Sequence, residues 1–319
     1  MGERRMKNSG QVTHFYLAPL EGITTFVYRN IYREMFGGME KYFTPFIAPT
    51  SNHDFKSREK RDILPENNRD IPLVPQILTN HADDFIYTAD CLREYGYKEI
   101  NLNLGCPSGT VVSKGRGAGF LAYPEKLDRF LDEIFEKTAG PLSIKTRLGK
   151  ESREEFREII KIYNKYPVCE LTIHPRTQKD FYKNRPDWDM FETALELSGN
   201  PVCYNGDIHS CEDYERFRER FADVTHIMLG RGVIANPGLV RQICTKEKLT
   251  MAERLSFMRC LCRAYMEIMP GEPTLFKMKE VWSYMCGESP DERKLWKRIK
   301  KAGNLAEYEK IILELGFTG

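Results

Sequence analysis

One cysteine of this sequence stands in a setting that indicates chemistry. Residues 101–120 read NLNLGCPSGTVVSKGRGAGF, in which a short apolar alternation ends at Gly105 and Cys106 follows at once. A thiol at the carboxyl end of a buried strand could be a nucleophile or a proton donor. Its reference pKa near 8.5 keeps it mostly protonated at neutral pH. A small buried apolar side chain is the usual role of a cysteine, but the Gly-Cys-Pro turn argues against that role here.

The segment after the cysteine is rich in glycine and carries two basic residues, Lys114 and Arg116. Loops on a rigid scaffold are where binding and catalytic groups concentrate. We therefore expect a flexible basic loop beside the thiol, which favours an anionic substrate.

Basic side chains alternate on two further segments. Lys145 and Arg147 share one face of a predicted strand, and His174 and Arg176 share a face of the next. Charged groups are rarely buried without a partner, so this row predicts a bound anion, such as a phosphate or a reduced flavin ring. Ion pairs at the surface are the alternative reading of the same residues.

Two amides and two glycine-bearing turns complete the candidate site. Gln76 and Asn103 end two predicted strands, and their amides can donate and accept, as the imide edge of a flavin or a pyrimidine requires. They could equally be structural amides that cap loops. Glycines in the turns Asn205-Gly206-Asp207 and Gly230-Arg231-Gly232 let backbone N–H groups approach an anion, which predicts a phosphate site; tight turns alone would also explain them.

Short β-rich runs that alternate with helical patterns must position these residues. Eight such runs are found, at His14–Glu21, Lys41–Ala48, Pro72–Leu78, Glu99–Leu104, Leu142–Leu148, Glu170–His174, Val202–Tyr204 and His226–Leu229. Helical patterns lie between them, including 83–95, 124–137, 152–166 and 211–221. This alternation predicts an α/β fold of the (β/α)8 TIM-barrel class, with the active site at the carboxyl ends of the strands. A doubly wound open sheet is disfavoured because no G-x-G-x-x-G follows the first strand.

Beyond about residue 245 the strand patterns stop. Helices are predicted over 250–268, 274–286, 291–302 and 304–315, so we divide the chain into a barrel domain (1–245) and a small helical domain (246–319). Residues 293–301 read RKLWKRIKK, and among the basic residues there are Lys297, Lys300 and Lys301. With Lys114 and Arg116 they predict a polyanion-binding surface, although a single basic helix face is often only solvated surface.

Composition excludes several classes of protein. The chain has 319 residues, 41% hydrophobic and 29% charged, with a net charge of +2, as in ordinary globular proteins. No stretch is apolar enough for a membrane helix, and the N-terminal MGERRMKNSG lacks the apolar segment of a secretory signal. The nine cysteines include no C-x-x-C pair, so we expect no metal centre and no disulfide framework. We expect a cytoplasmic protein that is a monomer.

Seven motifs, in order, resemble those of one enzyme family. APLEGIT, PQILTN, NLNLGCPSGTVVSKGRGAG, IKTRLG, TIHPRT, YNGDI and MLGRGVIANP are similar to segments of the tRNA-dihydrouridine synthases, which are flavin-dependent reductases of uridine in transfer RNA. The resemblance covers residues 13–245. The first motif departs from the family, which usually has Met at the position of Leu20 and Asp at that of Thr25.

The resemblance implies a role for each matched residue. FMN would contact Pro19, Leu20, Glu21, Gln76, Lys145 and His174, and its phosphate would be held by Asn205, Gly206, Asp207, Gly230 and Arg231. Asn103 would bind the target uracil and Cys106 would be the general acid. Arg147 and Arg176, with the basic loop and tail, would contact substrate or RNA.

The mechanism that the resemblance implies uses NADPH to reduce FMN, a hydride from flavin N5 to uracil C6, and a proton from Cys106 to C5. A flavin barrel that acts on a free pyrimidine, as dihydroorotate or dihydropyrimidine dehydrogenases do, is the main alternative. A catalytically inactive RNA-binding barrel is a second. The basic loop and helical tail favour the tRNA enzyme, since a small substrate needs neither.

Overall fold

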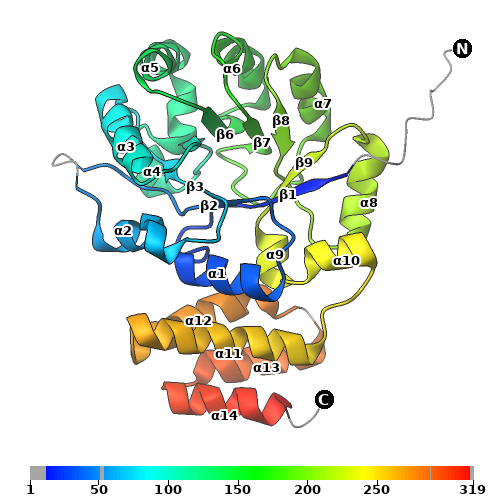
Figure 1. The fold of residues 1–319 in the computed structure, drawn as a ribbon. Coiled ribbons are helices and arrows are strands. Elements are labelled where there is room, and N and C mark those ends of the chain that lie inside the picture. The colour runs from blue at the N-terminus through cyan, green and yellow to red at the C-terminus, as the bar shows by residue number, and fades with distance from the viewer. Residues whose placement is uncertain (1–11, 51–53, 288, 317–319) are drawn as a thin grey trace, which may run out of the picture.

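The structure is a computed structural model that describes residues 12–50, 54–287 and 289–316. The N-terminal segment in which we expect no secretory signal lies outside these residues. Within them the chain forms a parallel β-barrel wrapped by helices, with a further layer of helices against one side (Figure 1). The predicted TIM-barrel fold is thereby confirmed.

Every strand pair of the barrel is parallel, and the hydrogen-bonded order is β3-β2-β1-β9-β8-β7-β6-β5-β4. The strands are β1 His14–Leu17, β2 Lys41–Phe43, β3 Leu73–Val74, β4 Gln76–Ile77, β5 Ile100–Leu104, β6 Leu142–Gly149, β7 Leu171–Thr177, β8 Val202–Tyr204 and β9 His226–Leu229. The third predicted strand is thus two short ones, because Pro75 between them has no N–H to donate. Its carbonyl still accepts from Asn101 N at 2.9 Å, so the ladder continues across the break.

Helices cover the outside of the barrel. They are α1 Phe26–Met35, α2 Ser57–Ile63, α3 Ala82–Glu94, α4 Gly109–Val112, α5 Pro124–Lys137, α6 Phe156–Tyr163, α7 Trp188–Leu197, α8 Cys211–Arg220, α9 Arg231–Ala235 and α10 Leu239–Thr245. Short 3₁₀ helices occur at Pro65–Asn67 (η1), Gly117–Ala122 (η2) and Arg153–Glu155 (η3). Helix α5 illustrates why these segments are helical. A proline occupies its first position, and its buried face consists of the apolar side chains Leu127, Phe130, Leu131 and Ile134.

Four helices follow the barrel: α11 Met251–Ile268, α12 Glu272–Met285, α13 Pro290–Lys301 and α14 Leu305–Gly316. They agree with the predicted helices to within two residues. Helix α11 packs on α1 and α12 packs on α9, so this layer rests against one side of the barrel (Figure 1). Tyr265 of α11 joins the two parts through a 2.7 Å hydrogen bond between its hydroxyl and Thr25 Oγ1.

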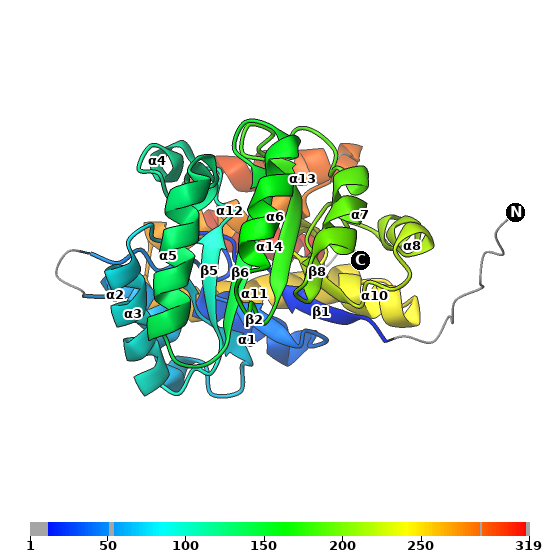
Figure 2. The ribbon, with the colours of Figure 1, turned by 90° about the horizontal axis from the view of Figure 1, so that it is seen from above.

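The carboxyl ends of the strands open toward one end of the molecule. Figure 2 shows α4, which follows β5, and α13 both toward that end, so the basic helix of the tail lies on the side of the barrel mouth. Within the described residues, none of the helices has the length and apolar character needed to cross a membrane.

Candidate active site at the barrel mouth

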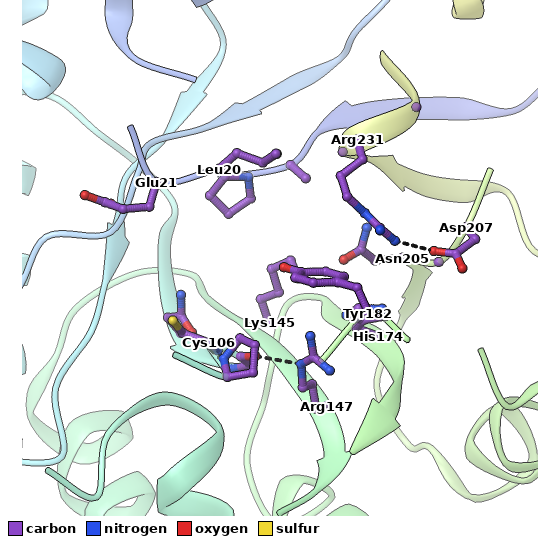
Figure 3. A pocket seen from close by; sticks show the side chains of 18 of the residues that line it. Leu20, Glu21, Cys106, Lys145, Arg147, His174, Tyr182, Asn205, Asp207 and Arg231 are labelled. Carbon is purple, nitrogen blue, oxygen red and sulfur yellow. Dashed lines mark hydrogen bonds and ion pairs between the residues drawn. The ribbon is translucent and has the colours of Figure 1, made fainter. Parts of the chain in front are cut away.

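A pocket at the carboxyl ends of the strands collects most of the residues singled out in the sequence (Figure 3). All thirteen residues assigned to the thiol, flavin, phosphate and uracil roles line it, together with Arg147. The thirteen are Pro19, Leu20, Glu21, Gln76, Asn103, Cys106, Lys145, His174, Asn205, Gly206, Asp207, Gly230 and Arg231. The strands that carry them are far apart in sequence, and closure of the barrel brings them together.

Cys106 is held in place by the side chain of a neighbouring asparagine. Asn103 Oδ1 accepts hydrogen bonds from the backbone N–H groups of Gly105 (3.0 Å) and Cys106 (2.9 Å), which closes the turn after β5. Burial raises the pKa of the Cys106 thiol, and the nearby Arg147 and Lys145 offset only part of that rise. The thiol is therefore protonated at neutral pH, as a proton donor must be.

The glycine-rich segment after the cysteine was expected to be a loop, and the structure shows helical turns there. It folds into α4 and η2, and Ala118 N donates to the carbonyl of Cys106 at 3.1 Å. Gly117 has a φ of +55°, and a Cβ there would lie 2.8 Å from the Cys106 carbonyl oxygen. The glycines thus let the segment pack directly on the cysteine turn, which their number in the sequence did not reveal.

Lys145 enters the pocket from β6 without an anionic partner. Within the described part of the chain, its ammonium group makes no ion pair with an acidic side chain and no hydrogen bond. Burial and the charge of Arg147 lower the pKa of Lys145 to about 8. A cation in that environment favours a bound anion, because an anion would restore the charged form.

His174 is neutral, so it presents an N–H dipole and no charge to the pocket. Its pKa is lowered well below the usual range by burial and by Arg147, Lys145, Arg176 and Arg231. Arg176 Nη1 lies 2.9 Å from His174 Nε2, and a guanidinium can only donate. Nε2 is therefore the acceptor, and the proton of the neutral ring is on Nδ1.

Asp207 orients two arginines. Its carboxylate pairs with Arg176 and with Arg231, whose Nη2 lies 2.6 Å from Oδ1, and its pKa is held well below the usual range although burial opposes that shift. These two ion pairs hold the side chain of Arg231 at the mouth of the pocket. Gly206 has a packing reason of its own, because a Cβ at that position would collide with the ring of Tyr204.

Arg147 and Arg176, which we expected to contact substrate or RNA, are buried and hydrogen-bonded within the protein. Arg176 also donates through Nε to the carbonyl of Asn184 at 2.6 Å. Arg147 is 1% exposed, and its three donor nitrogens bond three backbone carbonyls, so it joins the cysteine turn to the loop after β7. Strand spacing identified the face of both side chains but not their partners.

The residues after β1 line the opposite wall. Pro19 and Leu20 are half-buried there, whereas the carboxylate of Glu21 pairs with Arg58 of α2 and points away from Arg231 (Figure 3). On the far side Asn205 is fixed by Nδ2 donating to the carbonyl of Met228 at 2.8 Å.

The remaining predicted contacts lie outside the pocket. Lys114 is exposed, and Arg116 bonds Asn80 Oδ1 through Nε at 3.4 Å. Lys297, Lys300 and Lys301 are exposed on α13, which buries Leu295 and Ile299.

Two tyrosines of the pocket were missed in the sequence. Tyr182, on the loop after β7, lies under the guanidinium of Arg231 at 4.3 Å and that of Arg147 at 5.4 Å from its ring centre (Figure 3). Its side chain is half exposed, and the adjacent aromatic pair Phe181-Tyr182 in a strand-end loop was the available signal. Tyr284 comes from α12, so the helical layer contributes to the pocket wall, which no local pattern indicates.

A parallel barrel whose mouth gathers a protonated thiol, an unpaired lysine, amides and arginines has the fold and site of a TIM-barrel enzyme. The chain matches the family model described as "Dihydrouridine synthase (Dus)" over residues 16–313, and it belongs to that enzyme family.

Curated relatives agree with this assignment. The chain is 30% identical to a "Probable tRNA-dihydrouridine synthase" of Staphylococcus epidermidis over 70% of this chain and 69% of that protein. It is 30% identical to the "tRNA-dihydrouridine(16) synthase" of Aquipseudomonas alcaligenes over 71% and 74% of the two chains.

Solved structures share the fold at low identity. A variant of NCR from Zymomonas mobilis superposes with a TM-score of 0.52 and 12% identity, covering 74% of this chain and 88% of that one. Morphinone reductase in complex with tetrahydroNAD gives a TM-score of 0.52 at 10% identity, with 75% and 89% coverage.

Proposed function

We propose that this protein reduces uridine in transfer RNA to 5,6-dihydrouridine, with FMN as cofactor and NADPH as reductant. The observation that supports this most is the pairing, in one pocket, of a thiol that is protonated at neutral pH with a buried lysine that lacks an anionic partner. We infer the substrate, uridine in tRNA, from the names of the curated relatives.

The residues present fit a flavin phosphate. The positive charge of Lys145 would stabilise the negative charge of a reduced flavin ring. The amide of Gln76 would form hydrogen bonds with the imide edge of that ring. His174 would offer its Nδ1 proton beside the ring. The phosphate would lie near Asn205, Gly230 and Arg231, with Asp207 holding the arginine in place.

Bound FMN would supply the hydride, from N5 to C6 of the uracil. Cys106 would give its proton to C5 from the other face of the base, which saturates the C5–C6 bond and leaves a thiolate that takes a proton from water. Asn103 Nδ2 keeps one N–H beyond the bond that it makes to Gln76, and this N–H would hold a uracil carbonyl. Tyr182, with its exposed ring at the mouth, would contact the base or its sugar.

The uridine must leave its stack to reach the pocket. Lys114, Arg116 and the three lysines of α13 lie on the side of the mouth and would contact RNA phosphates there (Figure 2). We propose the barrel domain as residues 1–245 and the helical tRNA-binding domain as 246–319, with Tyr284 bringing the second to the edge of the first.

The test separates the two half-reactions. Purified protein loaded with FMN should oxidise NADPH, and reduced protein should then convert uridine in tRNA transcripts to dihydrouridine, measured by mass spectrometry of the nucleosides. Cys106→Ala should keep flavin reduction and lose dihydrouridine formation by about a hundredfold or more. Turnover of free uracil or uridine at a rate equal to that of tRNA would instead favour the free-pyrimidine enzyme.

A further inference from the structure

Four polar side chains at the pocket wall and behind it form one continuous series of hydrogen bonds that ends on the turn of Cys106. Asn103 Nδ2 donates to Gln76 Oε1 at 2.7 Å, and Gln76 Nε2 donates to Asn101 Oδ1 at 2.7 Å. Asn101 Nδ2 then donates to Ser143 Oγ at 2.8 Å. At the other end Asn103 Oδ1 accepts from the N–H groups of Gly105 and Cys106. We call this series the amide chain.

The barrel registers place the chain. Gln76 of β4 is in register with Asn101 of β5, and Asn101 is in register with Ser143 of β6, so the three side chains form one row across neighbouring strands. Asn103 follows two residues later on the same face. Gln76, Asn101 and Ser143 are at most 1% exposed, so each lost hydrogen bond would leave a buried polar group without a partner.

The direction of every bond follows from the cysteine turn. Backbone N–H groups can only donate, so Asn103 must present its oxygen to them and its nitrogen to Gln76. Gln76 must then present its oxygen to Asn103 and its nitrogen to Asn101, and the same logic passes to Ser143, whose hydroxyl can accept. The chain therefore leaves the second N–H of Gln76 and that of Asn103 for the pocket that both line.

We propose that Asn101, which does not line the pocket, is a positioning residue for uridine reduction. It acts through Gln76 and Asn103: it fixes the amide of Gln76, which fixes that of Asn103, which holds the turn of Cys106. The expected effect on uridine reduction rests on the proposed function. The hydrogen bonds to the turn of Cys106 can be tested in protein that carries out no reaction.

Asn101→Leu keeps the size of the side chain and removes both of its hydrogen bonds. In apo-protein it should speed backbone hydrogen exchange at Gly105 and Cys106 about tenfold, the equivalent of one net hydrogen bond. In protein saturated with FMN it should slow uridine reduction by a similar factor. Ser143→Ala should give smaller changes in the same direction. It replaces Asn101→Leu as the test variant if Asn101→Leu does not fold.

Asn101→Asp is the conservative variant. Burial keeps the introduced carboxyl protonated, so its carbonyl oxygen can accept from Gln76 and its O–H can donate to Ser143, as the amide does, and this variant should stay near wild type in both readouts. Thr146→Val is the matched control, because it removes a buried hydroxyl of the same strand as Ser143 whose partners, the Tyr163 hydroxyl and the Arg147 carbonyl, are not members of the amide chain. It should leave exchange at the cysteine turn unchanged.

The proposal is overturned if Asn101→Leu leaves exchange at Gly105 and Cys106 as in wild type, if Asn101→Asp is as impaired as Asn101→Leu, or if Thr146→Val has the same effect. Wild-type protein that makes no dihydrouridine yet shows the predicted exchange pattern would refute the proposed function alone, and the amide chain would stand.

Discussion

Arg147 Nε lies 2.9 Å from the carbonyl oxygen of Gly105, so the guanidinium of β6 is hydrogen-bonded to the turn that carries Cys106. Its other two nitrogens bond the carbonyls of Thr177 (2.8 Å), the last residue of β7, and Phe181 (2.9 Å), in the loop that follows. One buried cation thereby ties the proposed proton donor to the loop that presents Tyr182.

Replacement of Arg147 by lysine should destabilise the protein. A single ammonium cannot reach three carbonyls that the guanidinium spans, so buried acceptors lose partners and the free energy of unfolding should fall by about 3 kcal/mol. Urea denaturation measures this. Arg157→Lys on α6, an exposed arginine whose Nε is 3.6 Å from a Glu154 oxygen, should change it little. Equal denaturation midpoints for the two variants would show that the three bonds do not hold the loops.

The pKa of Cys106 predicts the pH dependence of uridine reduction. Burial raises that pKa, so the acid form persists through neutral pH and the rate of dihydrouridine formation by reduced enzyme should be flat there. The rate should fall as pH rises through the thiol pKa, because the proton donor is lost. Alkylation of Cys106 by iodoacetamide, followed by peptide mass spectrometry in apo-protein, should rise over the same pH range. Alkylation at neutral pH faster than that of free cysteine would contradict the raised pKa.

Lys145 should make FMN binding dependent on pH. Its pKa of about 8 in the protein means that an anion binds the protonated form better and raises the pKa. FMN affinity should therefore be constant below pH 8 and decline as pH rises above it. Titration of apo-protein by quenching of FMN fluorescence measures this, and Lys145→Met should bind more weakly without that decline. Because FMN has titrating groups of its own, the difference between the two proteins is the informative quantity, and identical profiles would remove Lys145 from the site.

Charge reversal on α13 should weaken tRNA binding in a salt-dependent manner. Changing Lys297, Lys300 and Lys301 to glutamate removes phosphate contacts, so the slope of log affinity against log salt should become shallower by about 2 to 3. Filter binding at several salt concentrations measures the slope. The matched control reverses Lys137, Lys161 and Lys165, which are exposed near the carboxyl ends of α5 and α6, where the chain turns toward β6 and β7 and away from the mouth, and it should keep the wild-type slope. Equal slopes for the two variants would exclude α13 as an RNA surface.

Sequence reasoning located the barrel and most of the pocket because both depend on local patterns. Alternation along each strand, with polar or glycine residues at its end, placed Cys106, Lys145 and Asn205 at one mouth before any contact was known. The positions of the four last helices followed in the same way from apolar periodicity and breaks. The split of the third strand at Pro75 was in principle visible too, since proline lacks the N–H that a ladder needs.

The tertiary structure determined which polar side chains are bonded within the protein and which remain available to a ligand. Period two puts Lys145 and Arg147 on one face, yet strand register gives Arg147 three carbonyl partners and leaves Lys145 for a ligand. The sequence likewise placed Asp207 near a phosphate, but only the folded chain shows its carboxylate committed to two arginines. Tyr284 and the amide chain depend on contacts between segments distant in sequence, and a local pattern carries no record of those contacts because packing and register set them.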